Sequence, residues 1–590
     1  MDIKDKLTAL RSFMEKRSLA AYIVPSTDPH SGEYVPEHWE ARKWISGFTG
    51  SAGTAVIGRE QAGLWTDSRY FLQAEEQLKG TEFILFKDRL PETPSIPEWL
   101  GSILPSGSIV GIDGEVNATC DVMQLEQQLA QYGIGLQATE DPFRQIWTDR
   151  PELPTSIPFI LPTSYSGESC RDKLTRIRNA YQLKEADGLL LSALDEVAWT
   201  LNMRGDDVHC NPVFVSYLLI TDELAILYIN KVKVNREMEI YLAEEGVIIR
   251  DYKEVGNDLR SYPGKCLLLP SATNYWLYRA ASRQANVLLA ASPVQLLKAI
   301  KNATEIKGFR QAMRKDGIAM VKFLRWLKEA VQHGTETEAS IDERLLQYRQ
   351  EQEGFKGISF DTIAGYQEHG AIVHYEATPT TAASLRAEGL LLLDSGGQYL
   401  EGTTDITRTI VLGPVSEEQI KDYTLVLKGM IALSSAVFPA GTCGTQLDVL
   451  ARQFMWREGI NYGHGTGHGV GHFLNVHEGP HQIRMNNMPA LLQPGMTVTN
   501  EPGIYKAGRY GIRIENTMLI TEKCQTEFGT YYQFVPLTLC PIDREAIDRK
   551  SLTQEEKDWL NDYHERVFNE LSPGLTKEEQ EWLAEATQKI

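Results

Sequence analysis

Two aspartates flank a glycine-rich turn in the second half of the sequence. Asp394 ends the β-prone run LLLLD, and Asp405 opens the run DITRTIVL. A hairpin formed by these two runs would bring the carboxylates together. Because aspartate also favours strand ends and turns for its own hydrogen bonds, the pair alone favours a structural role over chemistry.

A cluster of alternating histidines and glycines follows. Residues 463–472 read GHGTGHGVGH, and the glycines would let the backbone approach a ligand closely. The segment lacks both a GxGxxG pattern after a strand and a terminal Gly-Lys-Ser/Thr, which phosphate-binding loops require. The sequence therefore argues against nucleotide binding here.

Two glutamates repeat the arrangement of the aspartates. Glu501 closes the β-prone run TVTNE, and Glu515 sits inside a second β-prone run after a glycine-containing turn. Two aspartates, two glutamates and one histidine would form an oxygen-rich site for two metal ions, since bridging carboxylates are needed to hold two cations close together. These ligands suit Mn²⁺ better than zinc.

Two metal-free explanations fit less well. A carboxylate pair for glycoside hydrolysis would use two of the acids and leave the other two and the histidines unexplained. A serine triad of the hydrolase type is disfavoured because no GxSxG motif occurs. A metal centre remains the reading that uses all of these residues.

The length and composition predict a folded protein of several domains. A chain of 590 residues exceeds what one core usually organises, so we expect three or four domains. Apolar residues at 42% and charged residues at 23% are ordinary for globular proteins. The formal net charge of −20 argues against a nucleic-acid partner, because phosphate binding needs clustered basic residues.

The sequence also predicts a cytoplasmic location. The first residues carry charges throughout and have Ile3, Leu7, Leu10 and Met14 at helical spacing, which indicates a folded helix and not an export signal. No run of about 18 apolar residues occurs, so we expect no membrane span. The seven cysteines are scattered and form no CxxC pair, which is typical of reduced thiols in a cytosol.

An internal repeat divides the first half of the chain. The motif DKLT at residues 5–8 recurs at residues 172–175, an offset of 167 residues, and each copy begins an amphipathic helix. An apolar run that we interpret as a buried strand follows in each copy, at residues 20–24 and 188–191. The repeat predicts two related α/β domains.

A third segment contains all of the residues singled out above. Its first helix has Ile306, Met313 and Met320 at helical spacing. A capping box of Thr335 and Glu338 is predicted to open the next helix.

These motifs, in this order, resemble the pita-bread metallopeptidases, which include methionine aminopeptidase, prolidase and aminopeptidase P, together with creatinase, which shares the fold. The resemblance covers nearly the whole chain. The duplicated amino-terminal domains, the length and the ending PLTLCPID followed by SLTQEEKDWLNDYH are similar to the long, three-domain aminopeptidase P branch, the Xaa-Pro aminopeptidases.

This resemblance implies a fold of class α/β with four parts. Two related creatinase-like α/β domains are expected at residues 1–155 and 156–298. A pita-bread α+β catalytic domain is expected at residues 299–540, with a short helical extension at residues 541–590.

The resemblance also implies a role for each of the candidate ligands. Asp394 matches the family aspartate that binds one metal, and Asp405 matches the one that bridges both. His468 resembles the sole histidine ligand. Glu501 resembles the glutamate that binds the second metal and manages the proton of the bridging water, and Glu515 resembles the other bridging ligand.

Further residues match family positions around the metals. His374, His464 and His477 resemble histidines that contact substrate or steady the tetrahedral intermediate, and Arg513 resembles an arginine near the site. Arg69 in TDSRYFLQAEEQL is a candidate contact with substrate or with a neighbouring subunit. One departure is the polar sequence YQEH before GAIVHY, where smaller residues are expected; it affects the expected pocket shape and not metal binding.

The implied activity is hydrolysis of the bond between an N-terminal residue and a following proline, by a water activated by two divalent ions, expected to be Mn²⁺. Peptides with proline in second position are the expected substrates, and a homodimer is expected by resemblance. Three alternatives stay open: a prolidase that cuts only Xaa-Pro dipeptides, a metal-free creatinase-like amidinohydrolase, and a non-catalytic binding module. The module is expected to have lost its ligands, whereas all five are present here.

Overall fold

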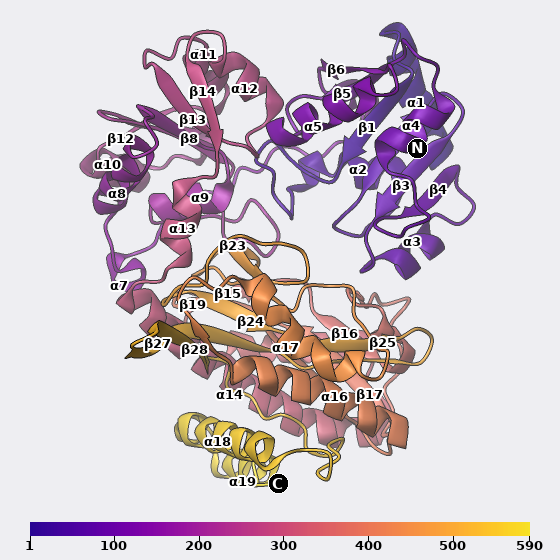
Figure 1. Ribbon diagram of the computed structural model, residues 1–590, viewed down its shortest axis with the longest axis vertical. Helices are drawn as coiled ribbons and strands as arrows, with labels where there is room; N and C mark the ends of the chain where they lie inside the picture. Colours follow the sequence, from indigo (N-terminus) through magenta and orange to yellow (C-terminus); the bar gives the residue numbers. More distant parts are fainter. The chain divides into compact units, whose positions relative to one another are not determined.

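The computed structural model describes residues 1–590, and the chain divides into two compact units (Figure 1). The first unit consists of Met1–Leu161 with Glu168–Gln295, and the second of Pro162–Gly167 with Leu296–Ile590. The first unit therefore contains the two repeated segments, and the second contains every candidate metal ligand.

A six-stranded sheet forms the centre of the first repeated domain. The strand order is β4-β3-β2-β1-β5-β6, with β1 antiparallel to β2 and parallel to β5. Helix α1 (Ile3–Lys16) begins after Asp2, whose carboxylate accepts a hydrogen bond from the Asp5 amide, and its apolar face joins the core beside the sheet. The strands are β1 (Ala21–Pro25), β2 (Thr54–Gly58), β3 (Ala62–Thr66), β4 (Phe83–Lys87), β5 (Ile109–Asp113) and β6 (Gly135–Thr139).

The second repeated domain has a sheet of the same design. Its order is β12-β11-β10-β8-β13-β14, and β8 is antiparallel to β10 and parallel to β13, as β1 is to β2 and β5. Helix α8 (Cys170–Gln182) precedes β8 as α1 precedes β1. The prediction of two related α/β domains is confirmed. The strands are β8 (Gly188–Leu191), β10 (Ser216–Thr221), β11 (Ala225–Ile229), β12 (Val247–Asp251), β13 (Cys266–Pro270) and β14 (Asn286–Ala290).

A buried histidine connects the two repeated domains within the first unit. His30 is 3% exposed, and its Nδ1 donates to the Ser192 carbonyl oxygen at 2.8 Å. Its Nε2 lies 2.9 Å from the Tyr252 hydroxyl. Burial lowers the pKa of His30, so the ring is neutral and the hydroxyl donates to Nε2. His30 thus bonds the first repeated domain to two residues of the second.

Antiparallel strands and long helices build the second unit. The candidate ligands lie on or next to three sheets, ordered β16-β17-β20, β21-β28-β27-β24 and β22-β23, where β21 is Val437–Pro439. The main helices are α14 (Ala303–Ala330), α15 (Glu338–Gln350), α16 (Glu417–Ser434) and α17 (Gly444–Trp456). The strands nearest the ligands are β16 (Ile363–Tyr366), β17 (Leu390–Ser395), β20 (Ile406–Val411), β22 (Gly467–Gly469), β23 (Glu478–Ile483), β24 (Thr497–Asn500), β25 (Gly503–Lys506), β26 (Tyr510–Arg513), β27 (Asn516–Thr526) and β28 (Gly529–Pro536).

Helix α15 starts two residues later than the predicted capping box requires. Thr337, not Thr335, is the N-cap, and its hydroxyl accepts from the Ser340 amide, so the predicted box is wrong. Glu338 is then the first helical residue, and its carboxylate is fully buried. Two threonines within one turn offer nearly equal caps, and the burial of Glu338 decides between them.

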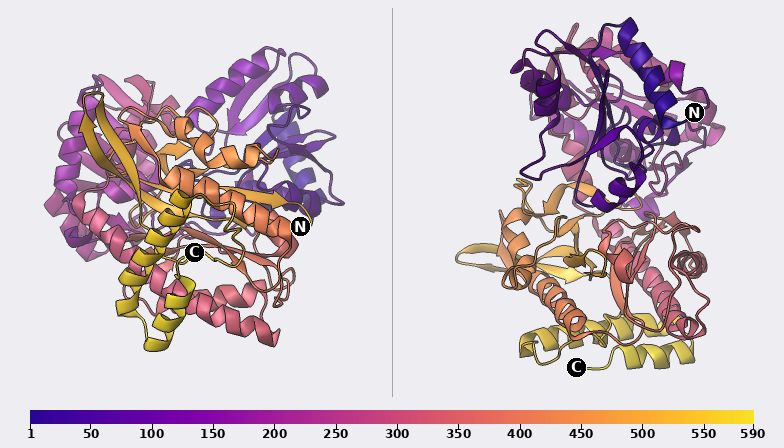
Figure 2. Two further views of the ribbon diagram at one scale, coloured as in Figure 1. Left: turned by 60° about the horizontal axis from the view of Figure 1, so that its bottom comes forward. Right: turned by 90° about the vertical axis from the view of Figure 1, so that its right-hand side faces the viewer.

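The chain ends in two helices, α18 (Gln554–Leu571) and α19 (Lys577–Ala586), each opened by a threonine capping box. Both pack against α14, and α18 also contacts α16 (Figure 2). The buried face of α18 joins the apolar core that contains residues of α16 and β26. The carboxy-terminal helices are therefore an integral part of the second unit.

Two observations concern the chain as a whole. None of its helices combines the length and the apolar character that a bilayer crossing requires. All seven cysteines are free thiols.

Candidate metal centre

Two pairs of antiparallel strands carry the four candidate carboxylates. In the first pair, β17 and β20, Asp394 lies opposite Thr407, and Asp405 directly precedes β20. In the second pair, β24 and β27, Glu501 directly follows one strand and Glu515 directly precedes the other. Glu515 was expected inside a strand and instead lies in the link between β26 and β27. Each strand pair thus brings two acids together at its end.

A bond between the two strand pairs joins the acids into one cluster. The Glu515 amide donates to the Thr407 carbonyl oxygen at 3.1 Å, and the Thr407 hydroxyl donates to Glu515 Oε2 at 2.9 Å. The Thr517 hydroxyl donates to the Asp405 carbonyl oxygen at 3.1 Å. These contacts fix both potential bridging carboxylates on a rigid backbone.

His468 enters the cluster from the short strand β22. Its Nε2 lies 3.3 Å from Asp405 Oδ2 and 3.6 Å from Glu501 Oε1. Its Nδ1 donates to the Gly469 carbonyl oxygen at 2.9 Å, which leaves Nε2 as the nitrogen that can bind a metal. One candidate ligand atom each from Asp405, His468 and Glu515 lie within 4.8 Å of one another.

The glycines around His468 are required by close backbone packing. A Cβ at Gly467 would lie 1.9 Å from the Thr499 carbonyl oxygen, and one at Gly469 would lie 2.4 Å from the Glu478 carbonyl oxygen. Only glycine therefore lets β22 approach its neighbours closely enough to deliver His468 to the acids.

Bound positive charge would stabilise the buried carboxylates of the cluster. Burial, and beyond it the neighbouring carboxylates, raises the pKa of Glu501 to about 7 and that of Glu515 further from its ordinary value. Burial likewise raises the pKa of Asp394, although Arg513 opposes the shift. Burial disfavours charge on His468 as well, but the Asp405 carboxylate outweighs it and raises the pKa of the ring to about 9.

These observations fit bound divalent ions. Asp394 Oδ1 is buried and has no hydrogen-bond partner in the protein, so it is available as a ligand. Four crowded carboxylates with one imidazole form the hard, oxygen-rich donor set that such ions take. The residues present therefore suit the group that the sequence analysis implied.

Arg513 supports the cluster from one side. Its Nη2 donates to Asp394 Oδ2 at 2.6 Å, and its Nη1 donates to the Tyr505 hydroxyl at 2.7 Å. The Tyr505 hydroxyl in turn lies 2.7 Å from His464 Nε2, whose Nδ1 donates to the Gly465 carbonyl oxygen. Tyr505 is a site residue that the sequence analysis missed, although its place between Glu501 and Arg513 on the β25–β26 hairpin was a usable signal.

The other two predicted histidines lie next to cluster residues. The His477 ring is 4.3 Å from that of His468 and nearly perpendicular to it. His374 follows Val373, whose carbonyl oxygen accepts a 3.5 Å contact from Arg513 Nη2. Both side chains are partly exposed, as groups that meet a substrate must be.

Buried ionic contacts hold the segments on which these histidines lie. Beside His477, the Glu478 carboxylate is 2% exposed and pairs with Lys298 at 2.8 Å and also with Lys301. Breaking such a pair would leave an uncompensated buried charge. The β23 end that bears His477 is therefore firmly anchored.

The unexpected polar sequence before His374 also has a structural use. The His369 Nδ1 lies 2.9 Å from Glu338 Oε2, and the Tyr375 hydroxyl donates to the same oxygen at 3.0 Å. The amides of Tyr366 and Ala383 donate to the Glu338 carboxylate too. Residues 366–383 are thus tied to the start of α15.

Arg69 lies in the first unit, just before helix α3 (Phe71–Gln77). Its guanidinium donates to both carboxylate oxygens of Asp67, at 2.8 and 2.7 Å. The contact of Arg69 with substrate stays a prediction.

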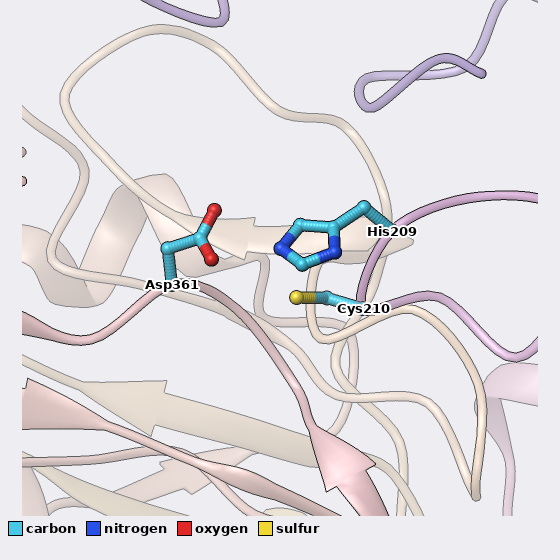
Figure 3. Close-up of side chains that lie close together, drawn as sticks. All are labelled: His209, Cys210 and Asp361. Carbon is cyan, nitrogen blue, oxygen red and sulfur yellow. The ribbon is translucent and has the colours of Figure 1, made fainter. Parts of the chain in front are cut away.

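Figure 3 shows three further side chains of metal-binding type. His209 and Cys210 are neighbours in the loop between β9 (Met203–Arg204) and β10 of the first unit. Asp361 belongs to the loop between β15 (Phe355–Ile358) and β16 of the second unit. The sequence analysis assigned them no role, and they lie outside the cluster of candidate ligands.

Comparison with known families covers nearly the whole chain. Residues 307–522 match the model of metallopeptidase family M24, and residues 530–590 match the C-terminal region of peptidase M24. Residues 6–145 and 149–305 each match a creatinase/prolidase N-terminal domain. The predicted fold class is confirmed, including the creatinase-like character of both amino-terminal domains.

Comparison with individual proteins gives matches along the full length. The chain is 40% identical over 596 residues to a probable Xaa-Pro aminopeptidase P from Laccaria bicolor, covering 98% of this chain and 92% of the relative. It is similar to the crystal structure of X-prolyl aminopeptidase from Caenorhabditis elegans, described as a cytosolic enzyme with a di-nuclear active site, with a TM-score of 0.96, 34% identity and complete coverage of both chains. A Xaa-Pro dipeptidase structure from Bacillus anthracis matches 64% of this chain and 99% of its own, with a TM-score of 0.51 and 25% identity.

Proposed function

The chain belongs to the Xaa-Pro aminopeptidase P branch of metallopeptidase family M24, and we propose that it removes the N-terminal residue from peptides whose second residue is proline. The convergence of Asp394, Asp405, His468, Glu501 and Glu515 on one cluster is the observation that carries this proposal. Full-length likeness to an enzyme described as having a di-nuclear active site supports it.

We assign these five side chains as ligands of two divalent ions. Asp405 and Glu515 match the family positions expected to hold both ions, and one candidate ligand atom of each lies within 4.8 Å of the other and of His468. Asp394 and Glu501 would complete the two ligand sets. Mn²⁺ is the proposed metal, since the donors are mainly carboxylate oxygens.

When bound, the two ions supply Lewis-acid activation of a water and of the scissile carbonyl. As the oxygen of the attacking water bonds to the carbonyl carbon, Glu501 accepts one proton from that water. Glu501 then returns the proton to the proline nitrogen as the peptide bond breaks, so no other proton donor is needed.

The surrounding residues bind and orient the peptide. His374 and His477 donate hydrogen bonds to the carbonyl oxygen as negative charge develops on it. Arg513 keeps Asp394 in place and neutralises part of its charge. Arg513 and His464 both bond the Tyr505 hydroxyl, which fixes the edge of the site where substrate is expected.

The remaining expectations follow from the same assignment. The Caenorhabditis elegans enzyme is described as cytosolic, and the free thiols of this chain agree with a cytoplasmic location, which we propose here. A homodimer is proposed by family resemblance. The net charge of −20 supports the absence of a nucleic-acid partner.

A substrate series tests the proposed activity. Protein stripped with a chelator and reloaded with Mn²⁺ is expected to release arginine from Arg-Pro-Pro and not from Arg-Ala-Ala or the dipeptide Arg-Pro. Each peptide is followed by chromatographic quantification of free arginine. The Glu501→Gln variant, prepared in parallel, controls for contaminating peptidases and is expected to be inactive.

Other outcomes select the alternatives. Cleavage of Arg-Pro alone would mean prolidase activity. Hydrolytic activity that survives complete metal removal would favour a creatinase-like reaction. Bound metal without any cleavage would favour a binding module.

A further inference from the structure

We propose that the carboxy-terminal helix α18 positions the metal centre, with Tyr563 acting through Arg408 on the link that carries Glu515. The inference rests on the proposed metal assignment. It gives the carboxy-terminal extension a role in metal binding, and Tyr563 and Arg408 become positioning residues.

Arg408 lies directly behind the candidate ligands. It belongs to β20, three residues after Asp405, and is 1% exposed. Its Nη1 donates to the Thr407 carbonyl oxygen at 2.9 Å and also to the Glu515 carbonyl oxygen. Its Nη2 donates to Asn516 Oδ1 at 2.9 Å. One guanidinium thus links β20, the strand that follows Asp405, to Glu515 and Asn516.

The same guanidinium also donates hydrogen bonds to the carboxy-terminal region. Arg408 Nε donates to the Pro541 carbonyl oxygen at 2.9 Å, and Nη2 contacts the Cys540 carbonyl oxygen at 2.8 Å. Nη2 also lies 2.9 Å from the Tyr563 hydroxyl. Arg408 is planar, with donors fixed in a fork, so its contacts on one side constrain those on the other.

Tyr563 completes the network from helix α18. Its hydroxyl lies 3.2 Å from Asn516 Oδ1, 3.1 Å from the Thr538 carbonyl oxygen and 3.0 Å from that of Cys540. The side chain is 5% exposed, and its ring stacks on Trp559 with centroids 5.4 Å apart. The hydroxyl is therefore held at one point, where it meets both Arg408 and Asn516.

These polar contacts indicate that α18 does more than cover the apolar core, because they reach the residues that hold the candidate ligands. Leu560, Val567 and Leu571 already bury an apolar face of α18 in the core. A phenylalanine at position 563 would preserve that burial and the ring stacking. The hydroxyl instead contacts a buried guanidinium whose other contacts hold Thr407 and Glu515, and it shares the acceptors Asn516 Oδ1 and the Cys540 carbonyl oxygen with that guanidinium. Buried polar networks of this kind fix one geometry when every member is satisfied.

The Tyr563→Phe variant tests this inference through metal affinity. Groups that orient metal ligands typically contribute 10- to 100-fold to affinity, and Tyr563 acts one contact further away, so we expect Mn²⁺ binding about 10-fold weaker than wild type. Affinity is measured by titrating stripped protein with Mn²⁺ against a competing chelator. Excess Mn²⁺ is expected to restore most of the lost Arg-Pro-Pro hydrolysis, because the ligands themselves are intact.

Tyr228→Phe is the matched control. Tyr228 is a fully buried tyrosine of the first unit whose hydroxyl donates to Asp258 Oδ2 at 2.7 Å. Its loss is expected to lower the melting temperature without changing Mn²⁺ affinity. Melting of both variants in chelator compares the structural cost of the two substitutions.

The outcomes separate this inference from the proposed function. If wild type binds Mn²⁺ and Tyr563→Phe binds it equally well, the positioning role is wrong and the proposed activity stands. Equal loss of affinity in Tyr228→Phe would show a general stability effect and would also overturn it. If wild type itself binds no Mn²⁺, both the metal assignment and this inference fall.

Discussion

The Glu515→Gln variant is expected to lose at least about 10³-fold in peptide hydrolysis and, without metal, to be more stable than the wild-type protein. The loss of activity follows because a neutral amide cannot bridge two cations as a carboxylate does. The gain in stability follows because Glu515 is 1% exposed and lies among other carboxylates. The glutamate that the proposed function requires at position 515 therefore lowers the stability of the metal-free protein.

The sign of the stability change follows from the pKa of Glu515. Burial, and then the charges of Asp405 and Asp394, raises that pKa well above its unfolded value. A carboxyl group with a raised folded pKa destabilises the native state increasingly as pH rises above the unfolded value. Glutamine removes this penalty, so we expect a gain on the order of 2 kcal/mol near neutral pH that shrinks towards pH 4.5.

Thermal melts in chelator and in Mn²⁺ measure both effects. Wild type is expected to gain stability on adding Mn²⁺, because the ions bind only the folded form, whereas Glu515→Gln should gain little. The matched control is Glu338→Gln, which alters a fully buried glutamate whose carboxylate is satisfied by His369, Tyr375 and two amides. This control should destabilise the protein and keep its response to Mn²⁺. A Glu515→Gln protein that is less stable than wild type in chelator would contradict the electrostatic account.

Replacing His477 with alanine is expected to lower kcat for Arg-Pro-Pro by about 10²- to 10³-fold with little change in KM. The hydrogen bond that His477 donates would strengthen as charge develops on the carbonyl oxygen, so its loss affects the transition state more than the bound substrate. Steady-state kinetics at saturating Mn²⁺ provide the measurement. His477→Asn keeps an N–H donor and should lose less.

Two controls accompany this variant. His333→Ala removes an exposed histidine at the end of a short helix and should leave both kinetic constants unchanged. Because the rings of His477 and His468 lie 4.3 Å apart, the bound Mn²⁺ is measured for each variant. A His477→Ala enzyme with full metal content and wild-type kcat would exclude the proposed contact with the carbonyl oxygen.

The sequence allowed prediction of the strand ends that carry the acids, because their pattern is local. Asp394 and Asp405 flank β-prone runs that do pair, and Glu501 ends a run of the second pair, whereas Glu515 was expected inside a strand and lies just before one. The repeat at residues 5–8 and 172–175 likewise led to two sheets with the same strand order. The strand ends could be predicted from the hydrophobic pattern within a few residues, and the two domains from comparison of the sequence with itself.

What the sequence did not reveal depends on contacts between distant residues. Tyr505 lies between two predicted site residues, Glu501 and Arg513, but its bonds to Arg513 and His464 cannot be inferred from the local sequence. Arg408 and Tyr563 are 155 residues apart in sequence and meet only after α18 has packed. The start of α15 was misplaced because local capping preferences do not include the burial of Glu338.

A titration of stripped protein with Mn²⁺, followed at each step by Arg-Pro-Pro hydrolysis and by the amount of bound metal, tests the central claim most directly. The account predicts that activity is absent without metal and reaches its maximum when two ions are bound per chain. Full activity in the stripped protein, or binding that saturates at a single ion with full activity, would contradict it.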